Sequence, residues 1–234
     1  MTDLSVLPRL WPTIALPGIA VRPATYWTVE LDEMPPVEQR LEGTLAWLLD
    51  AQTRQPSLAP GPDGPVGRSA DADGLRSIAG GHHLPQAFVR FIEDPEPRNH
   101  VPSATACFLD LGEFAVDVGD DGLLIHFLSD QQWVVHWLLF VGREGSEAVL
   151  ASSETLGFDA GEGEPIRAID PTSWPDTIAV CADSFEEFLY RYWAMNELFF
   201  QLVIDRIGVG ELPAELRRFA DRYPRAAAAR TIFR

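Results

Sequence analysis

Two histidines, His126 and His136, are the residues whose types and spacing could support chemistry. They lie in the segment LIHFLSDQQWVVHWLLFVG, residues 124–142, which predicts two strands joined by a short turn. If Ser129 pairs with Trp133 across that turn, His126 lies directly opposite His136 on the facing strand. Two facing imidazoles can begin a metal site, to which His82, His83 or His100 could add a third ligand. The alternative, which we favour, is a pair of hydrogen-bonded core histidines with no metal.

Carboxylates are the second group of reactive residues. They lie on consecutive predicted hairpins, at Asp110, Glu113, Asp117, Asp120, Asp121 and Asp130. Acid–base catalysis needs two carboxylates in unlike environments, whereas carboxylates at hairpin tips are normally all solvated alike. An exposed acidic ridge is therefore the better interpretation. The residues that we expect to bind a partner are Asp117, Asp120, Asp121, Asp130 and Gln131.

The common catalytic motifs are absent from the sequence. It contains no His-Glu-x-x-His, no Gly-x-Ser-x-Gly, no phosphate-binding loop and no Gly-x-Gly-x-x-Gly after a strand. Cys107 and Cys181 lie in apolar, strand-like runs without an adjacent basic residue, so we expect buried, unreactive thiols. The sequence therefore predicts a protein that is not an enzyme and needs no cofactor.

The charge balance is strongly acidic, with 35 acidic against 18 basic residues and a formal net charge of −17 in 234 residues. Such a charge repels nucleic acid and anionic lipid and accelerates encounter with a basic protein, although it can also serve solubility alone. No apolar run is long enough for a membrane span. The N-terminus is broken by Pro8, Pro12 and Pro17, unlike a signal peptide, so we expect a cytoplasmic protein.

Closely spaced strands must position these residues. They are predicted at 105–109, 114–118, 122–128, 133–141, 147–152 and 177–181, and their short links indicate antiparallel pairing. Both alternating faces of 133–141 are apolar, as in a central strand that is covered on both sides. Trp133 and Trp137 are therefore expected to be structural, buried residues.

Helices are expected to flank this sheet. Pro35 and Pro36 predict the start of a helix with an apolar stripe reaching Leu49. Shorter helices are predicted at 84–94 and 213–223, and the longest runs from a capping box at Ser184 and Glu187 to about Ile207. Asn196 interrupts the apolar stripe of the longest helix, so its amide must be hydrogen-bonded, most simply as a structural clamp.

Together these elements predict a single α+β domain with a curved, mainly antiparallel sheet of about five to six strands and a long C-terminal helix. We expect an N-terminal extension at 1–34, the α+β domain at 35–207 and a C-terminal helical extension at 208–234. Runs rich in Pro, Gly and Asp predict a flexible loop at 55–74, and a second loop is predicted at 156–175.

Three segments resemble the SUKH superfamily, the Smi/Knr-type cell-wall-regulator-like domains. LPQAFVRFIED (84–94) is similar to the helix that enters their sheet, and FLSDQQWVVHWLLFV with EAVLASS is similar to their central hairpin and next strand. ADSFEEFLYRYWAMNELFF (182–200) resembles their closing strand and helix. The similarity covers roughly residues 80 to 223, whereas the N-terminal third matches little.

The resemblance implies an α+β domain without catalytic activity that acts by binding another protein. Many bacterial relatives are immunity proteins that neutralise polymorphic toxins, so the resemblance implies a protein partner such as a basic toxin domain. Two alternatives stay open from the sequence: a regulatory scaffold with no toxin partner, and a metal-dependent enzyme that uses His126 and His136.

Overall fold

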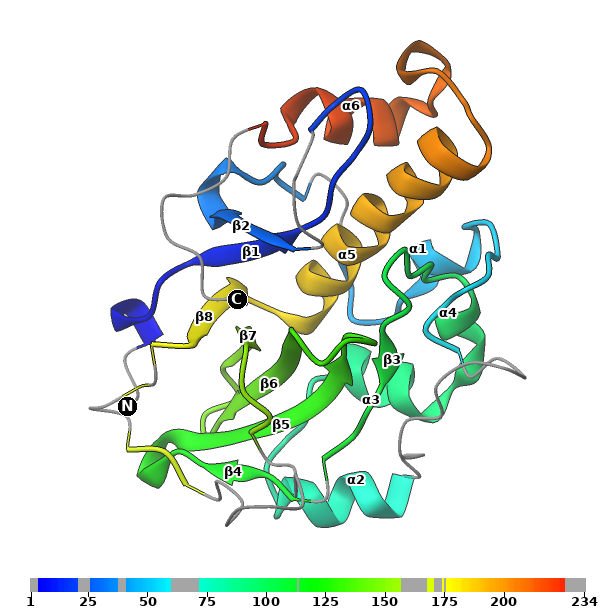
Figure 1. Ribbon diagram of the computed structural model, residues 1–234. Helices are drawn as coiled ribbons and strands as arrows, with labels where there is room; N and C mark the ends of the chain where they lie inside the picture. Colours follow the sequence, from blue (N-terminus) through cyan, green and yellow to red (C-terminus); the bar gives the residue numbers. More distant parts are fainter. Residues whose placement is uncertain are drawn as a thin grey trace.

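The computed structural model describes residues 4–20, 26–37, 41–59, 72–112, 114–156, 168–170, 174 and 176–225. Most of the loop predicted at 55–74 and much of the one predicted at 156–175 lie outside these ranges, as does Glu113. Within the described residues, the chain forms an α+β structure in which helices pack on antiparallel strands (Figure 1). The predicted fold class is confirmed.

The main sheet has six strands in the order β3-β5-β6-β7-β8, with β4 pairing on β5. All its strand pairings are antiparallel. Its strands are β3 (Phe108–Leu109), β4 (Val116–Asp117), β5 (Gly122–Ser129), β6 (His136–Gly142), β7 (Glu147–Ser152) and β8 (Ile178–Ala182). Every residue of β5 and β6 is buried, as the doubly apolar pattern of this hairpin predicts.

The longest helix, α5 (Phe185–Phe199), covers one face of the sheet through aromatic rings. Phe188 and Tyr192 lie 6.2 and 6.0 Å from Trp137 of β6, measured between ring centroids. The helix begins at Ser184, whose hydroxyl accepts the N–H of Glu187, while the Glu187 carboxylate accepts the N–H of Asp183. These two bonds satisfy donors that a helix start leaves unpaired.

The interior of α5 contains one hydrogen-bonded amide, Asn196. Its Oδ1 accepts the N–H of Ala104 at 2.8 Å, and its Nδ2 donates to the carbonyl of Tyr192 at 2.8 Å. The amide thereby holds the segment that leads into β3 against the helix. Beyond Phe199 the helix continues as a π-helical turn, Phe200–Ile204.

The opposite face of the sheet has a smaller apolar cluster. Leu124, Leu138 and Leu150 of the three central strands pack there with residues from four other segments, namely Leu7, Val116, Val118, Leu156 and Ile169. The sheet is therefore buried on both faces, which explains the scarcity of polar residues in β5 and β6.

The N-terminal segment is part of this packing. Strands β1 (Leu10–Thr13) and β2 (Trp27–Glu30) form a small antiparallel sheet, and Trp11 lies 5.7 Å from Phe188 of α5 between ring centroids. Arg9 adds a parallel bridge to Val180 of β8. In Figure 1, β1 and β2 lie on one side of α5, with α1 (Ala46–Leu49) and α4 (Pro95–Asn99) on the other.

The helix predicted from Pro35 to Leu49 is wrong over most of its length. Residues 35–37 and 41–45 are not helical, residues 38–40 lie outside the described ranges, and the α-helix begins only at Ala46. Leu45 has a left-handed φ of 54°, which a helix cannot accommodate. The apolar residues of this segment are nevertheless buried without a continuous helix, since Leu45 and Leu48 both lie in the main core.

The remaining helices are short. They are α2 (Ala72–Ala79), α3 (Gln86–Glu93) and α6 (Ala214–Arg222), together with 3-10 turns at Leu4–Val6, Leu31–Glu33, Gly119–Asp121 and Val209–Glu211. Among the described residues, no helix combines the length and the apolar composition that crossing a membrane requires.

Candidate functional site

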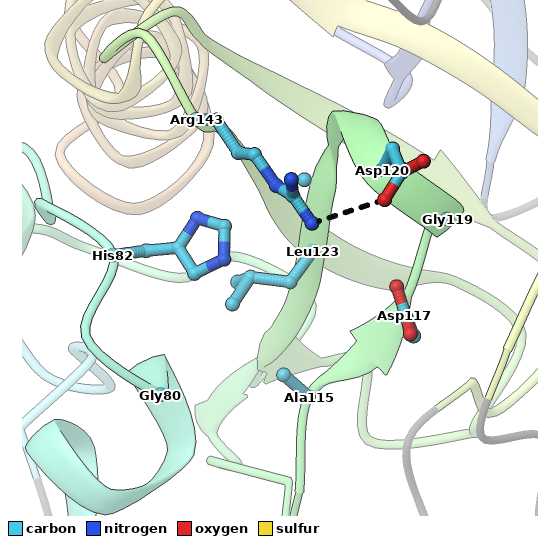
Figure 2. A pocket seen from close by; sticks show the side chains of 9 residues that line it. Gly80, His82, Ala115, Asp117, Gly119, Asp120, Leu123 and Arg143 are labelled. Carbon is cyan, nitrogen blue, oxygen red and sulfur yellow. Dashed lines mark hydrogen bonds and ion pairs between the residues drawn. The ribbon is translucent and has the colours of Figure 1, made fainter.

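A groove of about 480 Å³ opens at the end of the sheet where β5 begins. Four parts of the chain line it: the link between α2 and α3, the β4 region with its 3-10 turn, the start of β5, and the turn between β6 and β7. The lining residues are Gly80, His82, Ala115, Asp117, Gly119, Asp120, Gly122, Leu123 and Arg143. Figure 2 shows His82 and Arg143 reaching in from one side, with Asp117 and Asp120 on the other. We call it the acidic groove.

Two glycines shape the wall that carries the carboxylates. Gly119 has a φ of 60°, a conformation that side-chain-bearing residues rarely adopt. Gly122 lies so close to β6 that a Cβ atom there would be 2.4 Å from the carbonyl oxygen of Val141. The turn can therefore bring Asp120 to the groove only because neither position carries a side chain.

The charges of the acidic groove are weakly paired. The Arg143 guanidinium lies 3.4 Å from the Asp120 carboxylate, and these side chains are 60 % and 99 % exposed. An ion pair so exposed contributes little to stability. The Asp117 side chain is exposed and has no hydrogen-bond or ion-pair partner in the part of the chain that the structure describes. The groove thus retains unused capacity to bind a cation.

The structure brings only part of the predicted acidic ridge together. Asp117 and Asp120 line the groove, and the half-exposed Asp121 follows directly in the same turn. Gln131 is exposed as expected, but it lies beyond Ser129, at the other end of β5. The residues predicted to bind a partner therefore do not form one surface: the three carboxylates lie at one end of this strand and Gln131 lies at the other.

Asp130 was expected at an exposed hairpin tip, and this is wrong because the residue is only 1 % exposed. Its Oδ1 accepts the hydroxyl of Tyr26 at 3.0 Å, and its Oδ2 accepts the N–H of Gln132 at 2.9 Å. Burial raises the pKa of the Asp130 carboxyl, and these hydrogen bonds oppose the shift. The side chain folds back to organise its own turn, so it is not part of an exposed acidic surface.

The predicted burial of both tryptophans holds for Trp137 alone. Trp137 is 2 % exposed, whereas Trp133 is 43 % exposed and adopts a left-handed φ of 59°. The reason is the length of the turn: β6 starts at His136, so Trp133 belongs to the connection and not to the strand. Asp110, a further member of the predicted ridge, is also buried.

The two histidines do not pair directly across the strands. His126 lies opposite Leu138, and His136 lies opposite Ser129, because the turn is longer than predicted and Ser129 pairs with His136 instead of Trp133. Their rings are nevertheless close, 5.3 Å apart between centroids. Ser129 Oγ lies between them, 2.9 Å from His126 Nε2 and 3.0 Å from His136 Nδ1.

This buried polar cluster is completed by Asp110, whose Oδ2 accepts the Ser129 hydroxyl at 3.1 Å. The Asp110 carboxylate thus hydrogen-bonds to the serine itself. Burial lowers the pKa of His136 to about 4, so its imidazole is neutral near neutral pH. Within the described ranges, no group of three or more His, Cys, Asp or Glu side chains is placed to hold a metal ion.

The two thiols are both buried and unbridged. Burial raises the pKa of Cys107 and of Cys181, which keeps both sulfurs protonated. Cys107 lies 3.3 Å from the Tyr26 hydroxyl, within the polar contacts that support the β5–β6 turn. Both thiols are therefore buried, protonated groups of the core, as the sequence predicts.

Sequence reasoning considered His82 only as a third metal ligand and did not single out Arg143, yet both residues complete the acidic groove. Neither residue belongs to a motif, and each is far from Asp117 along the chain, so only the fold brings them together. Comparison with known proteins does not help to assign the groove, since no family model, no curated protein and no solved structure matches this chain. The resemblance to the SUKH superfamily therefore stays a prediction.

Proposed function

We propose that this protein is a non-catalytic binding module that captures a basic protein through the acidic groove. The observation that carries the proposal is Asp117, an exposed carboxylate that faces the groove and has no partner within the described residues. Asp120 lies beside it in an exposed ion pair with Arg143, which a lysine or arginine of the partner can displace. A groove of about 480 Å³ has room for such side chains.

The charge of the whole chain supports the same partner class. A net charge of −17 attracts a basic surface over a distance of about a Debye length and increases the rate of encounter. The groove then supplies specificity at short range, because its carboxylates lie at fixed positions on β4 and the turn that follows. Affinity for the partner should accordingly fall as the salt concentration rises.

The resemblance of segments 84–94 and 182–200 to SUKH domains narrows the proposal. We infer that the protein is an immunity protein that acts in the cytoplasm and neutralises a toxin by forming a complex with it. A toxin that acts on nucleic acid would present a basic surface, which fits the charge of the groove. In this role the protein needs a stable scaffold and an exposed acidic site but no catalytic group.

The test is co-expression with the protein encoded by the neighbouring gene, followed by purification of any complex. The wild-type chain should restore growth and form a stoichiometric complex. The double variant Asp117→Asn/Asp120→Asn should bind about ten-fold more weakly or worse. Asp32→Asn/Glu33→Gln removes the same charge from exposed residues outside the groove, so this control should bind like the wild type. Continued toxicity without a complex would overturn the proposal.

A further inference from the structure

The turn between β5 and β6 holds Trp133 in a costly arrangement. The residue has a φ of 59° and yet is 43 % exposed, whereas Trp11 and Trp137 are almost completely buried. A bulky residue at positive φ costs about 1–3 kcal/mol, which the surrounding structure has to offset. An exposed indole does not recover that cost by its own burial, so other contacts must hold the turn.

Those contacts come from Asp130 and its neighbours. The Trp133 N–H donates to the Asp130 carbonyl at 2.9 Å, and the Asp130 N–H donates to the Val135 carbonyl at 2.9 Å. The Asp130 carboxylate accepts the Gln132 N–H and the Tyr26 hydroxyl. The position of the indole is therefore fixed before any partner arrives, which reduces the entropy lost on binding.

Two rings support the indole from within the protein. Phe108 of the edge strand β3 lies 6.3 Å from Trp133 and His136 lies 5.6 Å from it, between ring centroids, with interplanar angles of 58° and 62°. The tryptophan is thus packed on some sides while almost half of it faces solvent. Partly exposed, rigidly held tryptophans are typical of the residues that dominate protein interfaces.

The turn that carries the indole also contains a buried carboxylate, which favours a cation as the ligand. The Asp130 carboxylate is buried, and the donors found for it in the described ranges are neutral, namely the Tyr26 hydroxyl and backbone N–H groups. No ion pair to Asp130 is present among the described residues. The exposed neighbours Gln131 and Gln132 carry no charge that would neutralise this field.

We propose that Trp133 is an anchor that binds an arginine side chain of a protein partner. The guanidinium would stack on the indole, within the field of Asp130, and its N–H groups could donate to the side-chain oxygens of Gln131 or Gln132. Arginine suits this site better than lysine because its cation is planar and weakly hydrated. This inference depends on the proposed function in one respect, namely that the partner is a protein. The Trp133 site lies at the opposite end of β5 from the acidic groove.

The test is a titration of the full-length protein with N-acetylarginine amide, observed through the indole N–H signals of its tryptophans by NMR. Trp133→Phe assigns the signal of Trp133. N-acetylcitrulline amide is the control because it has nearly the same shape without the charge. The arginine compound should shift the Trp133 signal several-fold more than the citrulline compound does, and more than it shifts the other indoles. Equal shifts with both compounds would overturn the proposal.

Two variants separate this site from the acidic groove. Gln131→Lys places a positive charge beside the indole at an exposed position and should abolish the arginine-specific shift. Asp117→Asn/Asp120→Asn should leave the shift unchanged. If the arginine shift is absent while the complex with the neighbouring protein forms, only the anchor is wrong. If the shift is present and no complex forms, the anchor stands and the proposed function fails.

Discussion

Arg54 and Glu197 form a buried bidentate ion pair, with Nε and Nη2 of Arg54 donating to the two Glu197 carboxylate oxygens at 2.7 and 2.8 Å. Nη2 also donates to Asp205 at 2.7 Å, and Gln201 donates to Glu197 Oε1. This network joins the segment after α1 to the end of α5 and to the π-helical turn. It connects parts of the chain that the sequence alone does not link.

Removal of Arg54 should destabilise the protein strongly. Arg54→Met leaves the Glu197 carboxylate buried without its cation, so the free energy of unfolding should fall by about 3–5 kcal/mol. The double variant Arg54→Met/Glu197→Met should lose much less, because no buried charge remains. Urea denaturation measures these differences. Arg143→Met breaks an exposed pair and should change stability by at most about 1 kcal/mol; a similar loss at both arginines would contradict this account.

Stability should fall with acid through His136. Its pKa is about 4 in the folded protein against 6.5 for an ordinary histidine. The unfolded chain therefore binds the proton more tightly, and the stabilisation present above about pH 6.5 is lost as the pH falls toward about 4. The slope for this group is about 1.4 kcal/mol per pH unit. An added proton would occupy Nε2, which has no hydrogen-bond partner in the described part of the chain.

Urea denaturation at several pH values tests this expectation. His136→Gln should reduce the loss of stability between about pH 6.5 and 4, because glutamine does not titrate. His83→Gln changes an exposed histidine and should leave the pH dependence as it is in the wild type. If His136→Gln keeps the full slope, the acid sensitivity arises elsewhere.

Gly122 should tolerate no side chain. A Cβ atom there would lie 2.4 Å from the Val141 carbonyl oxygen and 3.0 Å from the Gly142 Cα, both of which are backbone atoms. Gly122→Ala should therefore lower the free energy of unfolding by about 1–3 kcal/mol. Gly210→Ala is the matched control, since nothing lies within 4 Å of its added Cβ. Chemical denaturation of the two variants should separate them clearly, and equal stability would contradict the geometry.

The histidine pair should not hold a metal. Ser129 Oγ lies between the two imidazoles, and Asp110 hydrogen-bonds to that serine, so the ring nitrogens nearest each other are already engaged. Elemental analysis of the protein purified without chelator should find far less than one zinc per chain, and EDTA should leave its stability unchanged. A stoichiometric zinc that is lost in His136→Gln would restore the metal-dependent alternative.

The strands and α5 could be predicted because their apolar patterns are long and regular. The β5–β6 turn could not, because Ser129 pairs with His136 and the connection spans residues 130–135, so Trp133 lies in the turn instead of in the strand. Leu45 illustrates a second limit. Its spacing to Leu41 and Leu49 is that of a helix, but the residue has a left-handed backbone conformation and reaches the core without being part of a helix. Sequence spacing reports which residues are buried more reliably than how they become buried.

The acidic groove shows the same limit at the level of the site. Asp117 and Asp120 could be chosen from the sequence because a hairpin turn exposes its acids. His82 and Arg143 could not, because their place depends on how α2 and the β6–β7 turn pack around β5. The sequence could not distinguish the buried Asp130 from its exposed acidic neighbours. Its buried carboxylate accepts the hydroxyl of Tyr26, a residue just before β2 that is distant along the chain.

The central claim is that the carboxylates of the acidic groove bind a basic protein. The most direct measurement is the dissociation constant between the purified chain and the protein encoded by the neighbouring gene, obtained by calorimetry at low and high salt. We predict a one-to-one complex that weakens as salt increases, loses about ten-fold or more in affinity in Asp117→Asn/Asp120→Asn, and is unaffected by Asp32→Asn/Glu33→Gln. A complex whose affinity is the same in both double variants, or no complex with the wild type, would contradict the account.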